Sequence, residues 1–143
     1  MLHTHSRIWI HLVWATKKRQ RIIYKTQGIA LFDFLVNKAK SCEIPFEKIN
    51  IQPEHIHALI DLPTNKNLSE FMQTIKGSSS NMLNKEVFKT KFEWQRGYGA
   101  YSVSASRIEA IRKYIDNQKV HHHETSFEEE YQQWIKEYGL FGD

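Results

Sequence analysis

Cysteine, proline and long apolar runs are all scarce in this chain of 143 residues. Its single cysteine, Cys42, cannot form an internal disulfide, which fits a reducing compartment and predicts a cytoplasmic protein. No apolar run approaches the roughly 20 residues that a membrane-spanning helix needs. His3, His5 and Arg7 interrupt the N-terminal segment where a signal peptide would have its apolar stretch. These absences exclude a disulfide-stabilised secreted fold and predict no association with a membrane.

The composition is that of one soluble globular domain. Hydrophobic residues make up 41% and charged residues 25% of the chain, enough to build a core over residues 1–143. The net charge of +4 is unevenly spread, because no acidic residue occurs before residue 26. A basic cluster in that region follows a predicted strand and consists of Lys17, Lys18, Arg19 and Arg21. Such a cluster indicates contact with a phosphate backbone, although solvated surface charge explains it equally well.

Hydrophobic periodicity predicts the order strand, helix, strand, strand, helix, strand, and then two further helices. Capping boxes mark the start of the second helix at Asn67 and of the third at Ser106, while Gly77 to Ser80 predicts a break. The expected strands and first helix lie near residues 7–16, 27–41, 46–52, 55–62 and 98–104. This order predicts an α+β, ferredoxin-like fold, an antiparallel sheet with two helices on one face. The helix after the last strand can lie across the other face.

Two histidines, His55 and His57, flank one apolar residue in the strand expected at 55–62. Because side chains alternate along a strand, both imidazoles point to one face. The opposite face carries an unbroken apolar row for the core. Two imidazoles on the face away from the core form half of a metal site, and two surface histidines are the alternative.

A tyrosine and a glutamine share one stripe of the third predicted helix. Tyr114 and Gln118 are four residues apart, beside an inward face of Ile108, Ile111 and Ile115. A tyrosine oxygen can attack phosphorus, and a glutamine carbonyl can bind a hard cation. Taken without the histidines, Tyr114 fits an ordinary tyrosine at the edge of the core.

Five segments in this order resemble one known family. Besides the histidine strand and the Tyr-x-x-x-Gln helix, the matching segments are Ile10 to Arg19, Ile75 to Ser80, and Trp94 to Gly99. Together they span about residues 6–123. The chain resembles the single-tyrosine HUH transposases of insertion sequences, the IS-two-hundred-like group.

The resemblance implies a transposase that cuts and rejoins single-stranded DNA through a 5′-phosphotyrosine on Tyr114. It implies Mg²⁺ or Mn²⁺ as the metal, held by His55, His57 and Gln118. It also implies a homodimer that recognises DNA hairpins at the ends of the element. The residues expected to contact DNA are Lys17, Lys18, Arg19, Arg21, Lys76, Ser78 and Arg96.

Several alternatives stay open at this point. His122 could replace or join Gln118, and imidazoles also suit zinc. Glu54 could support a histidine as an outer partner, but a plain surface glutamate is expected. The first strand's second face, which carries Trp9 and His11, is too apolar for open water and needs a docked helix or another sheet. A domesticated relative that processes repeated palindromes, a non-catalytic RRM-like nucleic-acid-binding module, and a metal-storage or metal-sensing protein are the competing functions.

Overall fold

The computed structural model describes residues 4–88 and 91–117, and it confirms the predicted order of elements up to the third helix. The last of the helices expected from the sequence lies outside the described residues. The elements are β1 (Trp9–Ala15), η1 (Lys17–Arg19), α1 (Lys25–Ser41), β2 (Lys48–Ile51), β3 (His55–Asp61), α2 (Leu68–Met82), η2 (Leu83–Val87), β4 (Gly99–Val103) and α3 (Ile108–Asp116).

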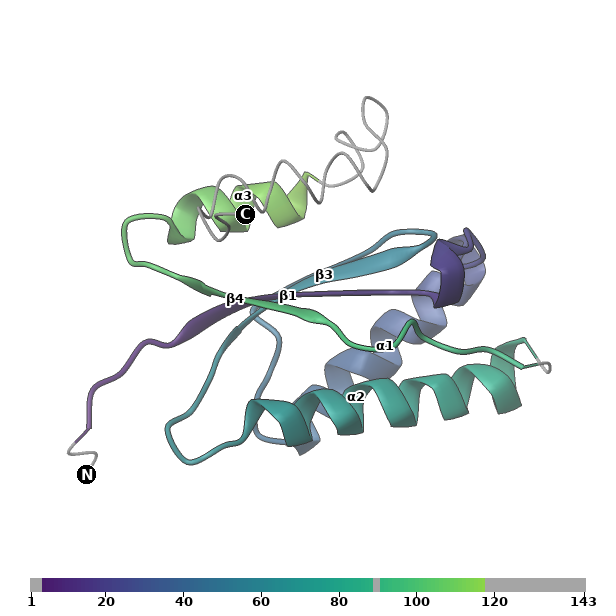
Figure 1. The fold of residues 1–143 in the computed structure, drawn as a ribbon, viewed down its shortest axis with the longest axis horizontal. Helices are drawn as coiled ribbons and strands as arrows, with labels where there is room; N and C mark the ends of the chain where they lie inside the picture. Colours follow the sequence, from purple (N-terminus) through teal and green to yellow (C-terminus); the bar gives the residue numbers. More distant parts are fainter. Residues whose placement is uncertain (1–3, 89–90, 118–143) are drawn as a thin grey trace.

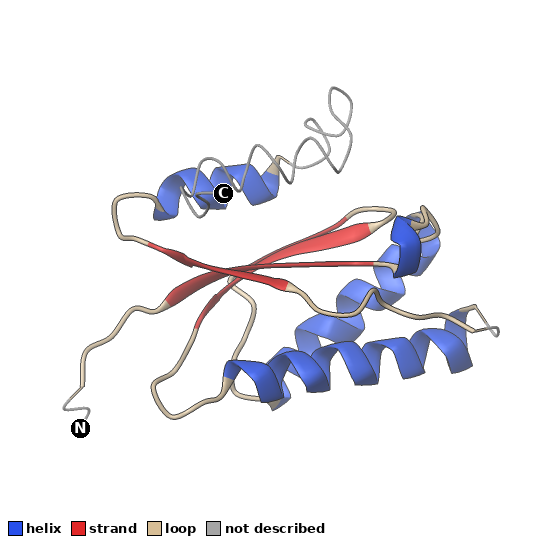
Figure 2. Cartoon of the chain, in the orientation of Figure 1, coloured by secondary structure: helices blue, strands red, loops and turns tan. Residues whose placement is uncertain are grey.

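The four strands form one antiparallel sheet in the order β2-β3-β1-β4. Helices α1 and α2 cover one face, and α3 lies across the other (Figures 1 and 2). The ferredoxin-like arrangement expected from the sequence is therefore confirmed. In the central pair, Ala15 lies opposite His55 and Val13 opposite His57, so the histidine strand runs through the middle of the sheet.

Both faces of the sheet are buried. The main core lies between the sheet and the helices α1 and α2, and includes Leu12, Trp14 and Ile56. A smaller cluster under α3 consists of Leu59, Val103, Ile108, Ile111 and Ile115, with Trp9 and Tyr114 packed against it. The apolar second face of β1 is thus covered by a docked helix of the same chain. A docked helix is one of the two alternatives that the sequence predicts for this face.

Two local expectations were wrong. Helix α2 continues through Gly77 to Ser80, where the serine hydroxyls donate to carbonyls one turn earlier in the same helix. Helix α3 begins at Ile108 with Arg107 as its N-cap, so the capping box expected at Ser106 does not form.

Within the two described ranges, no helix has both the length and the apolar character that crossing a membrane requires.

Candidate metal and tyrosine site

The two histidines of β3 form a buried pair on the face that α3 covers. His55 is 0% and His57 is 2% exposed. Their ring centroids are 4.8 Å apart, with the ring planes at 82°. This burial excludes the alternative of two surface histidines on a half-exposed strand.

A carboxylate supports His55 from outside the pair. Oε1 of Glu54 lies 3.0 Å from Nδ1 of His55, and the Arg21 guanidinium donates to the other carboxylate oxygen. Glu54 is 3% exposed, so the expectation of a plain surface glutamate was wrong. A carboxylate at Nδ1 favours the tautomer with the proton on that atom, which leaves Nε2 as the nitrogen that can bind a metal.

A third histidine, His11 on β1, contacts the pair. Its Nε2 lies 2.9 Å from Nδ1 of His57, and the residue is 0% exposed. Burial, and secondly repulsion by His57, lower the pKa of His11 well below its ordinary value. Sequence reasoning placed His11 on the second face of the first strand but gave it no role. The available signal was that the adjacent strand carries histidines on the same face.

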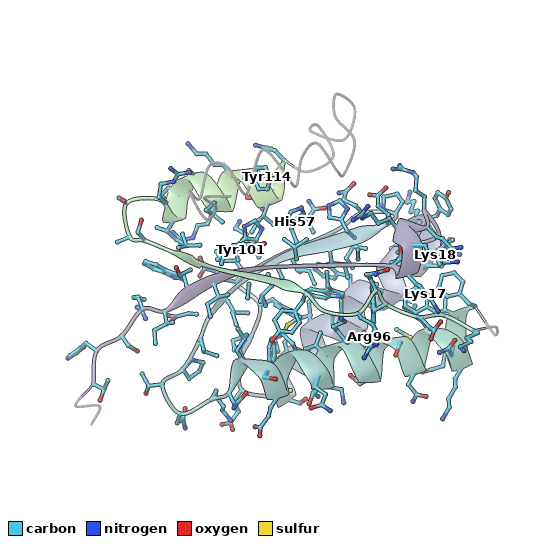
Figure 3. All side chains as sticks on the ribbon, viewed as in Figure 1. Lys17, Lys18, His57, Arg96, Tyr101 and Tyr114 are labelled. Atoms are coloured by element: carbon cyan, nitrogen blue, oxygen red, sulfur yellow. The ribbon has the colours of Figure 1, made fainter. Side chains whose placement is uncertain are left out.

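Tyr114 is brought beside the histidine pair by α3. Its ring centroid lies 5.5 Å from that of His57 and 6.0 Å from that of His11, both in edge-on contacts. Figure 3 shows Tyr114 on α3, directly over His57. The tyrosine and the histidines therefore meet, as the sequence predicts. They do so within one chain, whereas the sequence left open whether each tyrosine helix serves its own histidines or those of a partner.

Helix α3 is fixed to the sheet by apolar and polar contacts. Ile108, Ile111 and Ile115 face the sheet and are 6%, 2% and 0% exposed. The Asn50 side chain on β2 donates to the Ile115 carbonyl at 2.8 Å. Two ion pairs add to this hydrogen bond and join Lys48 to Asp116 and Arg112 to Glu47. These contacts determine where Tyr114 lies.

A second tyrosine, Tyr101 on β4, lies on the same face of the sheet (Figure 3). It is opposite His11 in the strand register. A Cβ atom added at Gly99 would lie only 2.7 Å from the Tyr101 ring, so the glycine makes room for this side chain. Sequence reasoning missed Tyr101 as a neighbour of the site.

Four of the predicted DNA-contacting residues gather near the histidine end of the sheet, and we call Lys17, Lys18, Arg19 and Arg96 the basic rim. The turn of η1 places Lys18 and Arg19 at φ 57° and 53°. The Lys18 amide donates to the Gln95 side chain at 3.0 Å, which brings η1 to the segment that carries Arg96. The Thr16 amide, just before η1, donates to the carbonyl of Glu54 at 2.9 Å. The basic rim is therefore adjacent to the residue that supports His55.

The other three predicted DNA contacts have partners inside the chain, as does Lys17 of the basic rim, which pairs with Glu93. The Lys76 ammonium donates to the carbonyls of Gln95 at 2.8 Å and Gly97 at 2.5 Å, and burial lowers its pKa. Ser78 donates to a carbonyl of its own helix, and Arg21 pairs with Glu54. Beside them, the Trp94 indole donates to the Ser79 hydroxyl at 2.9 Å. The segments 75–80 and 94–99 therefore bind each other.

Residues 4–118 match the family described as "Transposase IS200 like". The chain belongs to the IS200-like transposase family. Its enzymatic activity is accordingly that of a DNA transposase.

Curated relatives of the IS200-like family cover most of the chain. It is 28% identical over 124 residues to the transposase for insertion sequence element IS200 of Salmonella typhimurium, covering 82% of this chain and 81% of that protein. It is 24% identical over 114 residues to the ISDra2 transposase TnpA of Deinococcus radiodurans, covering 76% of this chain and 81% of that protein.

Solved structures show the same fold. A crystal structure from Deinococcus radiodurans R1, described as a candidate transposase, superposes with a TM-score of 0.68 at 22% identity, covering 82% of this chain and 95% of the other. A REP-associated tyrosine transposase bound to a REP hairpin superposes with a TM-score of 0.64 at 17% identity, covering 85% of this chain and 74% of the other.

IS200-like transposases generally depend on a metal, and the histidine pair fits one. Nδ1 of each imidazole faces a partner, Glu54 or His11, which leaves Nε2 as the nitrogen that a metal would use in both. Within residues 4–88 and 91–117, no three histidine, cysteine, aspartate or glutamate side chains are grouped to hold a metal. The predicted third ligand, Gln118, and its alternative, His122, lie outside the described residues.

Proposed function

We propose that this transposase cuts and rejoins single-stranded DNA with Tyr114 as nucleophile and with His55 and His57 as metal ligands. The observation that carries the proposal is the Tyr114 ring in contact with the ring of His57, over a buried imidazole pair. An ordinary tyrosine at the edge of a core needs no supported pair of histidines beneath it.

The reaction exchanges one phosphodiester for another. The Tyr114 oxygen attacks the scissile phosphorus, the bond between phosphorus and the 3′ oxygen breaks, and a 5′-phosphotyrosine forms. The phenol loses its proton, and the departing 3′ oxygen takes one up to become a free hydroxyl. A 3′-hydroxyl from another strand then attacks the phosphotyrosine and releases Tyr114. The bond energy is kept in the covalent link, so rejoining needs no nucleotide cofactor.

We propose Mg²⁺ or Mn²⁺ as the metal, held by His55, His57 and the side-chain oxygen of Gln118. His122 is the alternative third ligand. Bound there, a divalent cation supplies Lewis-acid polarisation of the scissile phosphate. Oxygen ligands from an amide and a phosphate suit these hard cations.

We propose that DNA approaches over the basic rim, which lies beside Glu54 and its neighbour His55. Four exposed cations at this end of the sheet supply attraction to phosphates that weakens with salt. The hairpin bound by the REP-associated relative supports a hairpin as the partner of this chain too. A homodimer is also part of the proposal. The apolar second face of β1 does not support it, because α3 of the same chain covers that face.

The test is a covalent adduct between the protein and single-stranded DNA from the ends of the element. In the presence of Mn²⁺, a denaturing gel should show the adduct for the wild-type chain and for Tyr101→Phe. Tyr114→Phe should bind the DNA and give no adduct. His55→Ala should lose metal binding and cleavage together.

Two results would contradict the proposal. An adduct from Tyr114→Phe that disappears on further replacement of Tyr101 would move the nucleophile to the sheet. Cleavage that survives EDTA would remove the metal from the reaction.

A further inference from the structure

His11 has no place in the proposed reaction, yet it is fully buried at the centre of the sheet. In the register of β1, it lies opposite Leu59 on β3 and Tyr101 on β4. Its ring nitrogen Nε2 is 2.9 Å from Nδ1 of His57, and the two ring centroids are 5.1 Å apart. A polar ring in this position costs free energy unless its hydrogen bonds are made.

The short distance between the two nitrogens requires one proton between them. Each neutral imidazole carries its proton on one nitrogen only. If the shared proton belongs to Nδ1 of His57, Nε2 of His57 carries a lone pair. If the shared proton belongs to Nε2 of His11 and His57 is neutral, then Nδ1 of His57 is the acceptor. The single proton of the His57 ring is in that case on Nε2 of His57, where it blocks a metal.

We propose that His11 is a positioning residue that accepts a hydrogen bond from Nδ1 of His57 and thereby presents Nε2 of His57 to the metal. The inference rests on the proposed role of His57 as a ligand. Since His11 has no exposed surface, a second proton on its ring would be a buried charge, so His11 is neutral and keeps one ring nitrogen that can accept a hydrogen bond. Binding of a metal at Nε2 of His57 then selects the arrangement in which Nδ1 of His57 carries the shared proton.

The two ligands would then be oriented by different chemistry. His55 is held by the Glu54 carboxylate, an anion that is itself paired with Arg21. His57 is held by a neutral imidazole in the middle of the sheet. An anionic partner strengthens a histidine as a ligand more than a neutral one does, so the pair is supported on both sides while only one negative charge is buried.

The first experiment needs no variant and no metal. Long-range ¹H–¹⁵N correlation spectra of the ¹⁵N-histidine-labelled protein report which nitrogen of each ring is protonated. His57, assigned by the signals that disappear in His57→Gln, should carry its proton on Nδ1. A proton on Nε2 of His57 in the metal-free protein would overturn the inference.

The second experiment uses a conservative and an apolar variant. In His11→Gln, the side-chain oxygen can accept near the position of Nε2, whereas His11→Leu removes the acceptor. Calorimetric titration with Mn²⁺ should show binding about 10- to 100-fold weaker for the leucine variant and close to wild type for the glutamine variant. The control is Leu59→Val, which alters packing directly opposite His11 without touching the hydrogen bond.

Thermal unfolding without metal separates positioning from stability. Leu59→Val should lower the midpoint of thermal unfolding and keep the wild-type affinity for Mn²⁺. Unchanged affinity in His11→Leu would overturn the inference, and so would an equal loss in both His11 variants, which would make His11 a ligand itself. If His11→Leu does not fold, the wild-type tautomer and the glutamine variant decide the question. A wild-type chain that binds no Mn²⁺ would refute the proposed metal site, whereas the tautomer of His57 is read independently of it.

Discussion

Replacing Ile111 by alanine should loosen α3 from the sheet while leaving the histidine pair intact. Ile111 is 2% exposed and lies at the middle of the apolar face that docks the helix. The helix has nine residues, too few to be stable on its own, so its order depends on docking. The variant therefore tests whether the position of Tyr114 is set by this apolar contact.

The size of the effect follows from what holds α3 in place. Burying each of the three isoleucines contributes about 1.5–3 kcal/mol. The ion pairs at Asp116 and Arg112 are partly exposed to solvent and contribute less than the isoleucines do. Removal of the Ile111 side chain should cost about 2–4 kcal/mol. At about 1.4 kcal/mol per factor of ten, the ratio of docked to undocked helix should fall roughly 30- to 700-fold.

Hydrogen exchange, adduct formation and metal binding measure the three expected results. Amides of residues 108–116 should exchange faster, while those of β1 and β3 keep their protection. The yield of the Tyr114–DNA adduct should fall, and the equilibrium affinity for Mn²⁺ should fall with it, because the proposed third ligand, Gln118, comes two residues after the end of α3 in the sequence. Lys113→Ala, an exposed change on the same helix, is the matched control. Unchanged exchange of the α3 amides, or an unchanged yield of adduct, would refute this account.

Three further predictions concern the surroundings of the site. Glu54→Ala should weaken Mn²⁺ binding about 10- to 100-fold in a calorimetric titration, because His55 loses the carboxylate at Nδ1, whereas Glu93→Gln should not. Lys76→Met should lower the free energy of unfolding in urea by about 1–2 kcal/mol, because two carbonyls lose their donor. An unchanged free energy would show that these two hydrogen bonds do not stabilise the fold. Lys17→Met should raise the pKa of Glu93, which the hydrogen bond from Lys17 lowers, back toward its ordinary value in a ¹³C NMR titration. The Lys17–Glu93 pair stabilises the fold at pH values above the ordinary pKa of the carboxyl, and this stabilisation is lost as the pH falls through the lowered pKa of Glu93. The same pKa of Glu93 in the wild type and in Lys17→Met would refute the pairing.

Period and spacing predicted the parts of the site that lie on regular elements. Alternation placed His55 and His57 on one face of β3, and helical spacing turned Ile108, Ile111 and Ile115 toward the sheet. Both patterns follow directly from backbone geometry. The family resemblance joined the tyrosine helix to the histidine strand, a pairing across more than fifty residues that periodicity cannot give.

The contacts that depend on tertiary distance were not predictable in this way. Glu54 looked like a surface residue, because nothing local shows that Arg21 and His55 surround its carboxylate. Lys76 looked like a DNA contact, since its two carbonyl partners come from a turn about twenty residues later. A charge in the sequence shows that a partner is needed, and only the fold shows whether that partner is a phosphate or the chain itself.

The near-complete burial of His55 and His57 under α3 has a kinetic consequence. We expect an ion from solvent to reach their nitrogens faster when α3 is undocked, so the rate of metal loading should depend on how often α3 undocks as well as on the affinity of the imidazoles. Ile111→Ala should then exchange its ion faster than the wild-type chain. The helix that carries the proposed nucleophile would then also control how fast the cation enters the site.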